Sequence, residues 1–418
     1  MKLSMSLPPF IRICAATLFA AVTVVSGLVS GAATAQSAEL RALFSQPVRL
    51  ERPDTPDAIP MEVRGGKLFV PAAANGIEQE FIFDTGSPTI LSRQLADQLG
   101  LEPLGQNTGF DANGNPVTMD IVQLDQLVIG HTVFRDVPVL VFDFSSLATG
   151  GCLIGGGVIG SEILPGSVWR IDAQSETLTI AATTDALADH DPDLSGRLHD
   201  FGYPHAPIID YQLGEISDRA LFDTGSADAI TLFARVAESA SARARMVPGS
   251  LQRGEGQEGE SAGGRGPTGP LARFSLREFE LSGQALPTAP ATIRAVPPTL
   301  LGAGWLSSHV ITLDYAGANI FFEARPEPAE PRVDAGYAIA WVDDHAEVVQ
   351  LFEGSAAAQA GLRLGDHVVR LNDRSMQADG AAVCNTVRWL FADFNAGDAA
   401  DIEVTRASGP VVIHVPPH

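Results

Sequence analysis

Residues 80–87 read EFIFDTGS, and residues 219–226 read RALFDTGS. The pentapeptide Phe-Asp-Thr-Gly-Ser therefore occurs twice in one chain, with Asp84 and Asp223 at the same place in each copy. Average amino-acid usage makes two chance copies in one chain very rare. The repeat indicates a duplication, and its chemistry is expected to need both copies.

The similarity extends outward from each copy. Two short extended runs precede each one, around Asn75-Gly76 and around Leu213-Gly214, and predict β-hairpins. The segments 90–100 (ILSRQLADQLG) and 230–240 (ITLFARVAESA) follow the two copies, and they predict short amphipathic helices. The material between is mostly strand-like.

The two repeats also end alike. The segment VIGSEILPGSVWRID (158–172) aligns without gaps on LLGAGWLSSHVITLD (300–314), so that Gly160 matches Gly302. Gly160 lies 76 residues after Asp84, and Gly302 lies 79 residues after Asp223. This agreement in length predicts two β-rich lobes of the same architecture.

Composition divides the rest of the chain. An apolar run after Lys2 and Arg12 ends at Ala33-Thr34-Ala35, the layout of a secretory signal peptide, although the run is also long enough for an uncleaved membrane anchor. The Gly/Glu-rich stretch 249–270 has the composition of a flexible surface loop. The expected divisions are a signal peptide (1–35), an N-terminal segment (36–59), lobe 1 (60–182), an inter-lobe linker (183–195), lobe 2 (196–325), a Pro-rich linker (326–332) and a C-terminal domain (333–418).

Charge and cysteine content exclude several classes of function. The formal net charge of −23 argues against nucleic acid and anionic membrane as partners. Cys152 and Cys384 remain after the signal peptide; they could pair in an oxidising compartment, but they lie in different expected domains, so two free buried thiols are expected.

Other catalytic and cofactor motifs give no support. No zinc spacing, His-Glu-x-x-His motif or Gly-x-Ser-x-Gly elbow is present, so we expect no metal and no serine hydrolase. Residues 155–160 and 264–269 match Gly-x-Gly-x-x-Gly, but neither has the strand and helix that a dinucleotide site requires, so we expect no cofactor.

Residues 60–325 resemble the aspartic proteases of the pepsin and retropepsin type, in which a strand leads to Asp-Thr-Gly-Ser and an apolar-apolar-Gly strand closes the lobe. The resemblance implies a mainly β, bilobal acid protease fold with two lobes of six to eight strands. It also implies that Asp84 and Asp223 form the catalytic dyad. Two adjacent carboxylates cannot both ionise readily, so the pair acts as acid and base on a bound water.

The resemblance also assigns roles to the neighbouring residues. Threonines should lock the two loops together, glycines should leave the backbone close to the carboxylates, serines should hydrogen-bond the outer carboxylate oxygens, and the closing-strand glycines should allow tight passage beside the loop. These supporting residues are Thr85, Gly86, Ser87, Thr224, Gly225, Ser226, Gly160 and Gly302.

The chain departs from the pepsin pattern in lobe 1. Pepsin-like enzymes place a Tyr on a flap hairpin over the cleft, whereas residues 108–119 contain no Tyr and offer Phe110 instead. The lobes also lack the disulfides of secreted eukaryotic members. A bacterial exported relative nearer the retropepsin pattern fits these features better.

The stretch 352–373 (FEGSAAAQAGLRLGDHVVRLND) resembles a PDZ domain of the bacterial protease-associated kind, a small β-sandwich-like fold with two helices. A helix is expected near AAVCNTVRWLF (381–391) and strands at ADIEVTR (400–406) and PVVIHV (410–415). Such domains bind a peptide C-terminus at a sheet edge. The candidate carboxylate loop comprises Gly336, Tyr337, Ala338 and Ile339. The alternative is a domain that only packs on the protease or closes its cleft.

The sequence therefore predicts an exported aspartic endopeptidase, periplasmic or secreted, that acts on polypeptide. The PDZ domain would recruit or position substrate, with a peptide C-terminus as a further partner. We expect no nucleic acid as a partner, and no membrane unless the signal segment is uncleaved. The alternative is an inert periplasmic peptide-binding adaptor. Activity lost on substitution of either aspartate separates the two.

Overall fold

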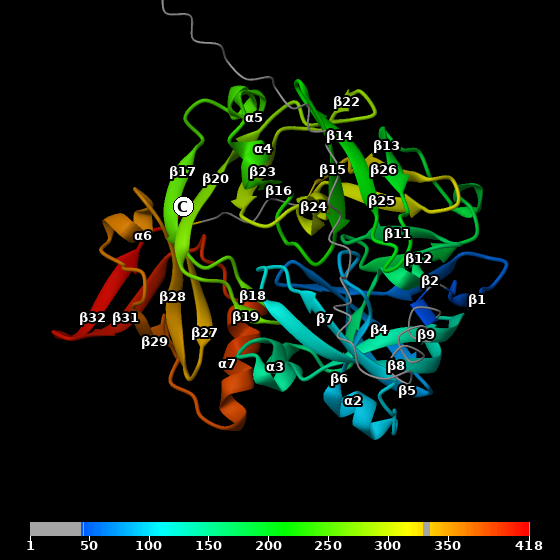
Figure 1. Ribbon diagram of the computed structural model, residues 1–418. Coiled ribbons are helices and arrows are strands. Elements are labelled where there is room, and N and C mark those ends of the chain that lie inside the picture. The colour runs from blue at the N-terminus through cyan, green and yellow to red at the C-terminus, as the bar shows by residue number, and fades with distance from the viewer. Residues whose placement is uncertain (1–42, 45, 329–334, 418) are drawn as a thin grey trace, which may run out of the picture.

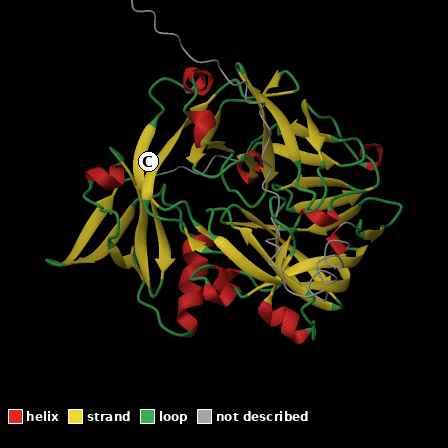
Figure 2. Ribbon diagram, in the orientation of Figure 1, coloured by secondary structure: helices red, strands yellow, loops and turns green. Residues whose placement is uncertain are grey.

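The computed structural model describes residues 43–44, 46–328 and 335–417, and strands are the main secondary structure of these residues (Figures 1 and 2). The expected signal peptide and part of the Pro-rich linker lie outside the described residues. Within the described residues, no helix is both long and apolar enough to cross a membrane.

The first repeat (residues 67–172) contains most of one sheet, whose strand order is β1-β9-β6-β10-β5-β4-β8-β7, with β3 paired to β4. A single short helix, α2 (Arg93–Gln98), follows β6, and the side chain of Ser92 caps it by accepting from the Leu95 N–H. The strands are β1 (Arg49–Glu51), β3 (Glu62–Arg64), β4 (Lys67–Ala74), β5 (Ile77–Phe83), β6 (Ile90–Ser92), β7 (Gly105–Phe110), β8 (Pro116–Ile129), β9 (Thr132–Phe142) and β10 (Gly157–Ile159).

The second repeat (residues 208–314) is built in the same way. Its helices are α4 (Ala234–Ala237) and α5 (Ala240–Arg245). The expected helices at 90–100 and 230–240 thus begin later than predicted, because β6 and β16 take their first, β-branched residues. The strands are β14 (Ile208–Leu213), β15 (Ile216–Asp223), β16 (Ile230–Phe233), β17 (Gln252–Gly256), β18 (Glu260–Ser261), β19 (Gly264–Arg265), β20 (Gly269–Leu276), β21 (Glu280–Leu281), β22 (Gln284–Ala285), β23 (Ala289–Arg294) and β24 (Thr299–Gly302).

A closing strand holds each Asp-Thr-Gly-Ser loop in place. In the first repeat β10 runs parallel to β5 and antiparallel to β6, with Ile159 opposite Phe83. In the second, β24 runs parallel to β15 and antiparallel to β16, with Gly302 opposite Asp223. The same pairing occurs twice, so each aspartate leaves its strand beside the closing strand of its own repeat.

An antiparallel sheet joins the two repeats, in the order β2-β12-β11-β25-β26-β13. Its central pair is β11 with β25, in which Val168 lies opposite Asp314. These strands come from the segments that align in sequence, and a twofold relation brings a segment against its own counterpart in this way. The strands are β2 (Asp57–Pro60), β11 (Val168–Asp172), β12 (Thr177–Ala181), β13 (Leu194–His199), β25 (His309–Asp314) and β26 (Asn319–Ala324).

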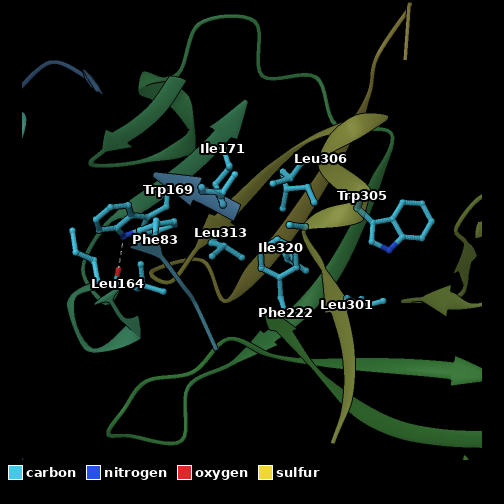
Figure 3. Close-up of a cluster of buried hydrophobic side chains, with 14 of the residues drawn as sticks. Phe83, Leu164, Trp169, Ile171, Phe222, Leu301, Trp305, Leu306, Leu313 and Ile320 are labelled. Carbon is cyan, nitrogen blue, oxygen red and sulfur yellow. Dashed lines mark hydrogen bonds between the residues drawn. The ribbon is translucent and has the colours of Figure 1, made fainter. Parts of the chain in front are cut away.

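The main core combines side chains of this joining sheet with side chains of both repeats (Figure 3). The rings of Trp169 and Phe83 stack with their centroids 5.6 Å apart, and the Trp169 indole N–H donates to the Leu164 carbonyl at 3.0 Å. Phe83 and Phe222, which precede the two aspartates, are both fully buried. Burial of these rings holds the two aspartate-bearing strands in one continuous core.

Residues 249–270 are ordered, so the expectation of a flexible surface loop is wrong. Strand β17 pairs with β20 on one edge, and on the other edge Gly254 lies opposite Phe352 of β28. A Cβ at Gly254 would lie 2.6 Å from the Leu351 carbonyl oxygen, so the missing side chain allows the close approach of β28. The glycines that suggested flexibility permit strand pairing instead.

Residues 335–417 form a C-terminal unit with its own buried cluster, which includes Val348, Leu371 and Ile402. The helix and the two final strands expected from the sequence are confirmed. The elements are β27 (Tyr337–Val342), β28 (His345–Phe352), α6 (Ala356–Gln359), β29 (His367–Leu371), β30 (Arg374–Ser375), α7 (Ala381–Ala392), β31 (Ala400–Arg406) and β32 (Gly409–Val415).

Cys152 and Cys384 form a disulfide, so the expectation of two free thiols is wrong. Cys152 lies in α3 (Gly150–Leu153) of the first repeat and Cys384 in α7, 232 residues later. The expectation failed because the two residues were assigned to separate domains, whereas α3 packs directly against α7 (Figure 1).

Candidate active site

The two Asp-Thr-Gly-Ser loops meet between the repeats. Thr85 donates its backbone N–H to the Thr224 hydroxyl at 3.0 Å, and Thr224 donates its N–H to the Thr85 hydroxyl at 3.1 Å. Each hydroxyl then donates across to the other strand, to the carbonyls of Phe222 and Phe83 at 2.7 and 2.8 Å. Both threonines are fully buried, so this reciprocal network locks the loops together.

Each aspartate carboxylate is oriented by its own loop. The Gly86 N–H donates to Asp84 Oδ1 at 2.9 Å, and the Gly225 N–H donates to Asp223 Oδ1 at 2.8 Å. The two bonds are equivalent because the two loops have the same sequence and backbone course. They keep both carboxylates at the floor of the site.

The two carboxyl groups lie against each other. A Cβ at Gly86 would lie 2.5 Å from Asp223 Oδ1, and one at Gly225 would lie 2.4 Å from Asp84 Oδ2. Each glycine therefore faces the carboxylate of the other repeat, and no side chain fits in either place.

This arrangement perturbs the acidity of the pair. Loss of hydration in the site raises the pKa of Asp84 to about 7, and the negative charge of Asp223 acts in the same direction, while the Lys67 ammonium lowers it. A carboxyl that stays protonated near neutral pH beside one that can ionise is an acid and base pair. Such a pair can remove a proton from a water and return it to a leaving group.

The closing strands pass the loops with no spare room. A Cβ at Gly160 would lie 2.3 Å from the Ser87 carbonyl oxygen, and one at Gly302 would lie 2.6 Å from the Ser226 carbonyl oxygen. The serines differ from expectation. The Ser87 hydroxyl donates to the Pro88 carbonyl at 2.7 Å, and within the described residues neither serine hydroxyl bonds the carboxylate of Asp84 or Asp223. The Ser87 hydroxyl therefore bonds the main chain of its own turn instead of the carboxylate.

The tip of the β7–β8 hairpin of the first repeat reaches across to the second repeat. The β7–β8 turn (residues 111–115) is closed by Asp111, whose Oδ1 accepts the N–H groups of Asn113 and Asn115. The Arg294 guanidinium at the end of β23 donates to the Ala112 carbonyl at 2.9 Å. Phe110, which the sequence offered as a cover for substrate, is 78% exposed.

The β18–β19 hairpin (residues 257–266) holds this turn from the second repeat. The Gly263 N–H donates to Asp111 Oδ2 at 2.8 Å, and the Asn113 amide donates to the Gly264 carbonyl at 3.1 Å. The same hairpin reaches the C-terminal unit, where Arg265 donates to the Trp341 carbonyl at 3.1 Å. The β18–β19 hairpin thus links the tip of the β7–β8 hairpin to the C-terminal unit.

Sequence reasoning missed Lys67, Arg294 and Glu162 in and near the site. Lys67 donates to the Gly225 carbonyl, and Arg294 acts on Asp223 through its charge. Glu162 is 2% exposed and accepts the Thr89 N–H at 2.9 Å; burial raises its pKa to about 7. One signal was available for the first of these, because Lys67 is the single lysine after Lys2.

The candidate residues of the C-terminal unit lie apart from the dyad. Gly336 has a left-handed backbone (φ +79°), and its carbonyl accepts the Phe352 N–H at 2.8 Å. Tyr337 is 4% exposed and packs in the core of the unit, whereas Ala338 and Ile339 are half-buried along β27. In the described parts of the chain, no three His, Cys, Asp or Glu side chains cluster in a way that could hold a metal ion.

Comparison with protein-family models gives a match to part of the chain. Residues 70–163 match the family model described as aspartyl protease, a segment that contains the first aspartate loop and its closing strand. The match supports an aspartyl protease family and, with it, peptidase activity on a polypeptide substrate. No curated protein matches the chain.

Proposed function

We propose that the protein is an exported aspartic endopeptidase in which Asp84 and Asp223 form one catalytic dyad. The observation that carries the proposal is the reciprocal bonding of Thr85 and Thr224, which brings the two carboxyl groups into contact across the repeats. The family match on residues 70–163 supports the class of reaction. The second aspartate comes from the duplicated motif at 219–226.

The proposed architecture is bilobal, with lobe 1 at residues 60–182 and lobe 2 at 196–325. Its support is the repeated placement of β10 beside β5 and of β24 beside β15. A twofold relation between the lobes presents two equivalent carboxylates to one site. One chain then supplies both halves of the dyad.

The mechanism follows from the shared proton. The dyad, holding one proton, takes a proton from a water while the water oxygen attacks the carbonyl carbon of the scissile peptide. The dyad then protonates the amide nitrogen as the C–N bond breaks, and the initial charge state returns. The protons titrate with the pair, so the two aspartates share the acid and base roles.

Hydrolysis of an unfolded protein by the purified full chain, across pH 3 to 8, tests the proposal. We expect Asp84→Asn and Asp223→Asn each to reduce kcat/KM by more than about 1000-fold, because neither remaining carboxyl can exchange the shared proton. Asp125→Asn is the matched control, since Asp125 is an exposed residue of β8.

The pH profile provides a further criterion. Activity should fall as the pH rises through about 7, because the carboxyl of Asp84, with its pKa raised to about 7, then loses the proton that the dyad needs. Activity that survives either substitution contradicts the dyad. Inactivity of the wild type at every pH supports the inert peptide-binding adaptor instead.

We further propose that the C-terminal unit is a PDZ-type domain whose peptide-binding face is covered by the first repeat. Among the described residues β27 pairs only with β28, which leaves its other edge toward α7. Cys152 and Leu153 pack into the cluster that includes Ile339 and Trp341, and Arg388 of α7 donates to the Cys152 carbonyl at 3.0 Å. These contacts favour packing over recruitment while the disulfide is intact.

Export is proposed from the signal-like N-terminus and is supported by the disulfide. Cys152 and Cys384 are joined by a disulfide, a bond that persists in oxidising compartments and is rare in the cytosol. N-terminal sequencing of the protein recovered outside the cytoplasm checks cleavage after Ala35. A mature chain that begins at Met1 contradicts it.

A further inference from the structure

Lys67 occupies a position beside the dyad that no motif predicts. It begins β4, directly after the Gly65-Gly66 turn, and its side chain crosses to the second repeat, where the ammonium donates to the Gly225 carbonyl. The residue is half-buried, and it is one of two lysines in the sequence, the other being Lys2. A lone cation of this kind, directed at an active-site loop, calls for a chemical explanation.

The Lys67 ammonium binds Gly225, and Gly225 in turn contacts the Asp84 carboxylate. Gly225, whose carbonyl it binds, faces Asp84 so closely that a Cβ there would lie 2.4 Å from Asp84 Oδ2. An ammonium at this range favours the ionised carboxylate. The charge of Lys67 accordingly opposes the rise in the pKa of Asp84 that burial and Asp223 cause.

The C-terminal unit holds the turn that carries Lys67. Gly65 has a left-handed backbone (φ +56°), and a Cβ on it would lie 2.5 Å from the ring of Phe391 in α7. On the other side, a Cβ at Gly66 would lie 2.9 Å from Cβ of Ala227, just after the second Asp-Thr-Gly-Ser motif. The turn is therefore enclosed between α7 and the catalytic loop.

Other charges near the dyad come from different elements. Arg294, at the end of β23, is 9% exposed and interacts with Asp223 and with Glu258. On the turn itself, Arg64 pairs with Glu62 and Glu80 and stacks over Phe69, so its charge is compensated locally. Lys67 is the cation that acts on Asp84.

We propose that Lys67 is a positioning residue that sets the pH range in which the dyad holds a single proton, and that α7 keeps it in place through Phe391. The inference rests on the proposed aspartic protease function. It extends that function by making the charge state of the dyad depend on the C-terminal unit.

The first test compares pH profiles of kcat/KM for the full chain. In Lys67→Met both limbs should move to higher pH by about one unit, because loss of the cation favours the protonated carboxyl. Lys67→Arg should restore the wild-type profile. Arg49→Met, which removes an exposed cation of β1 paired with Asp136, should leave the profile unshifted.

The role of α7 is tested by Phe391→Ala, which should shift the profile in the same direction by less, since the turn then has room to move. A Lys67→Met profile that falls in height without moving along the pH axis overturns the inference and assigns Lys67 a structural role. In that case Asp84→Asn still reports independently on the proposed function, because activity that survives that substitution contradicts the dyad.

A second measurement does not depend on activity. In protein labelled with ¹⁵N-lysine, the Nζ signal of Lys67, identified by its loss in Lys67→Arg, should shift with pH as the dyad titrates. Asp84→Asn should abolish that step. A Lys67 signal that shows no titration, or one that Asp84→Asn leaves unchanged, overturns the inference even if no substrate is cleaved.

Discussion

Hairpin β7–β8 of the first repeat and hairpin β17–β20 of the second occupy the same place along their repeats, between the helix and the closing strand, yet they differ in what they contact. The first ends in a compact turn closed by Asp111. The second carries the additional β18–β19 hairpin and pairs β17 with β28 of the C-terminal unit. The first hairpin contacts the second repeat, and the second hairpin contacts both the first hairpin and the C-terminal unit.

The aspartate loops show the opposite behaviour. Thr85 and Thr224 exchange equivalent hydrogen bonds, and Gly86 and Gly225 face the opposite carboxylates at nearly equal distances. Duplication thus preserved the residues that must act as a pair. The hairpins around the pair could diverge in sequence, because each hairpin packs against different neighbouring residues.

The largest expected effect in this comparison is on kcat/KM, when the glycine of one aspartate loop is replaced and the other is kept. Gly86→Ala and Gly225→Ala should each reduce kcat/KM by more than about 100-fold, because the new methyl group displaces the opposite carboxylate. Gly269→Ala is the control, since a Cβ there meets no atom within 4 Å. Steady-state kinetics distinguish the three. Wild-type activity in either loop variant would show that the carboxylates are not held in contact.

The next largest effect concerns the free energy of unfolding and the disulfide that joins the first repeat to the C-terminal unit. Replacing Cys152 and Cys384 together by Ser should lower the free energy of unfolding by about 4 kcal/mol, because the disulfide closes a very long loop. Denaturant unfolding under oxidising conditions measures the loss. With reductant added, wild type and variant should become equal.

The same variant tests the covered face of the C-terminal unit. A fluorescent peptide with an apolar free C-terminus should bind the double Ser variant at least about tenfold more tightly than the oxidised wild type. The corresponding peptide amide is the control. Equal binding to both proteins would show that α3 does not cover the peptide-binding face.

A smaller expected effect on stability comes from Glu162, which follows the closing strand of the first repeat and has no counterpart in the second. Glu162 aligns with Gly304 and is buried, and its pKa rises from 4.5 to about 7 in the fold. Folding therefore favours the protonated acid, so stability is complete below pH 4.5 and falls by about 3 kcal/mol as the pH rises through 7. The charge on His205 opposes this shift.

Glu162→Gln should remove that loss, because the amide oxygen still accepts the Thr89 N–H and carries no charge. We expect the variant to be about 3 kcal/mol more stable than wild type at pH 8 and equal to it at pH 4. Glu102→Gln, at an exposed position, is the control. Identical urea curves at pH 8 would show that Glu162 gains a compensating partner.

The smallest effect tests the contact between the two hairpins. Asn113→Ala removes the hydrogen bonds to the carbonyls of Gly259 and Gly264. The contact between the β7–β8 turn and the β18–β19 hairpin should then be weaker by about 1 kcal/mol. We expect KM to rise about fivefold with kcat little changed. Asn107→Ala on β7 is the control. An unchanged KM would show that the β18–β19 hairpin does not hold the β7–β8 turn.

Much of the site could be predicted because the signals are local and repeated. The turn at Asn75-Gly76, the aspartate-bearing strands and the helix at 381–392 follow from short patterns, and the duplication indicated that Asp84 and Asp223 act together. Composition was misleading at 249–270, where glycine permits close strand pairing as readily as it permits flexibility.

The sequence by itself determined that two Asp-Thr-Gly-Ser loops exist and that each follows a buried strand, because neighbouring residues decide strands and turns. Only the tertiary structure decided that Lys67 reaches Gly225, that Cys152 meets Cys384 and that β17 adds to β28. Those contacts join residues 94 to 232 positions apart. They depend on how complete sheets pack, and no local pattern specifies that packing.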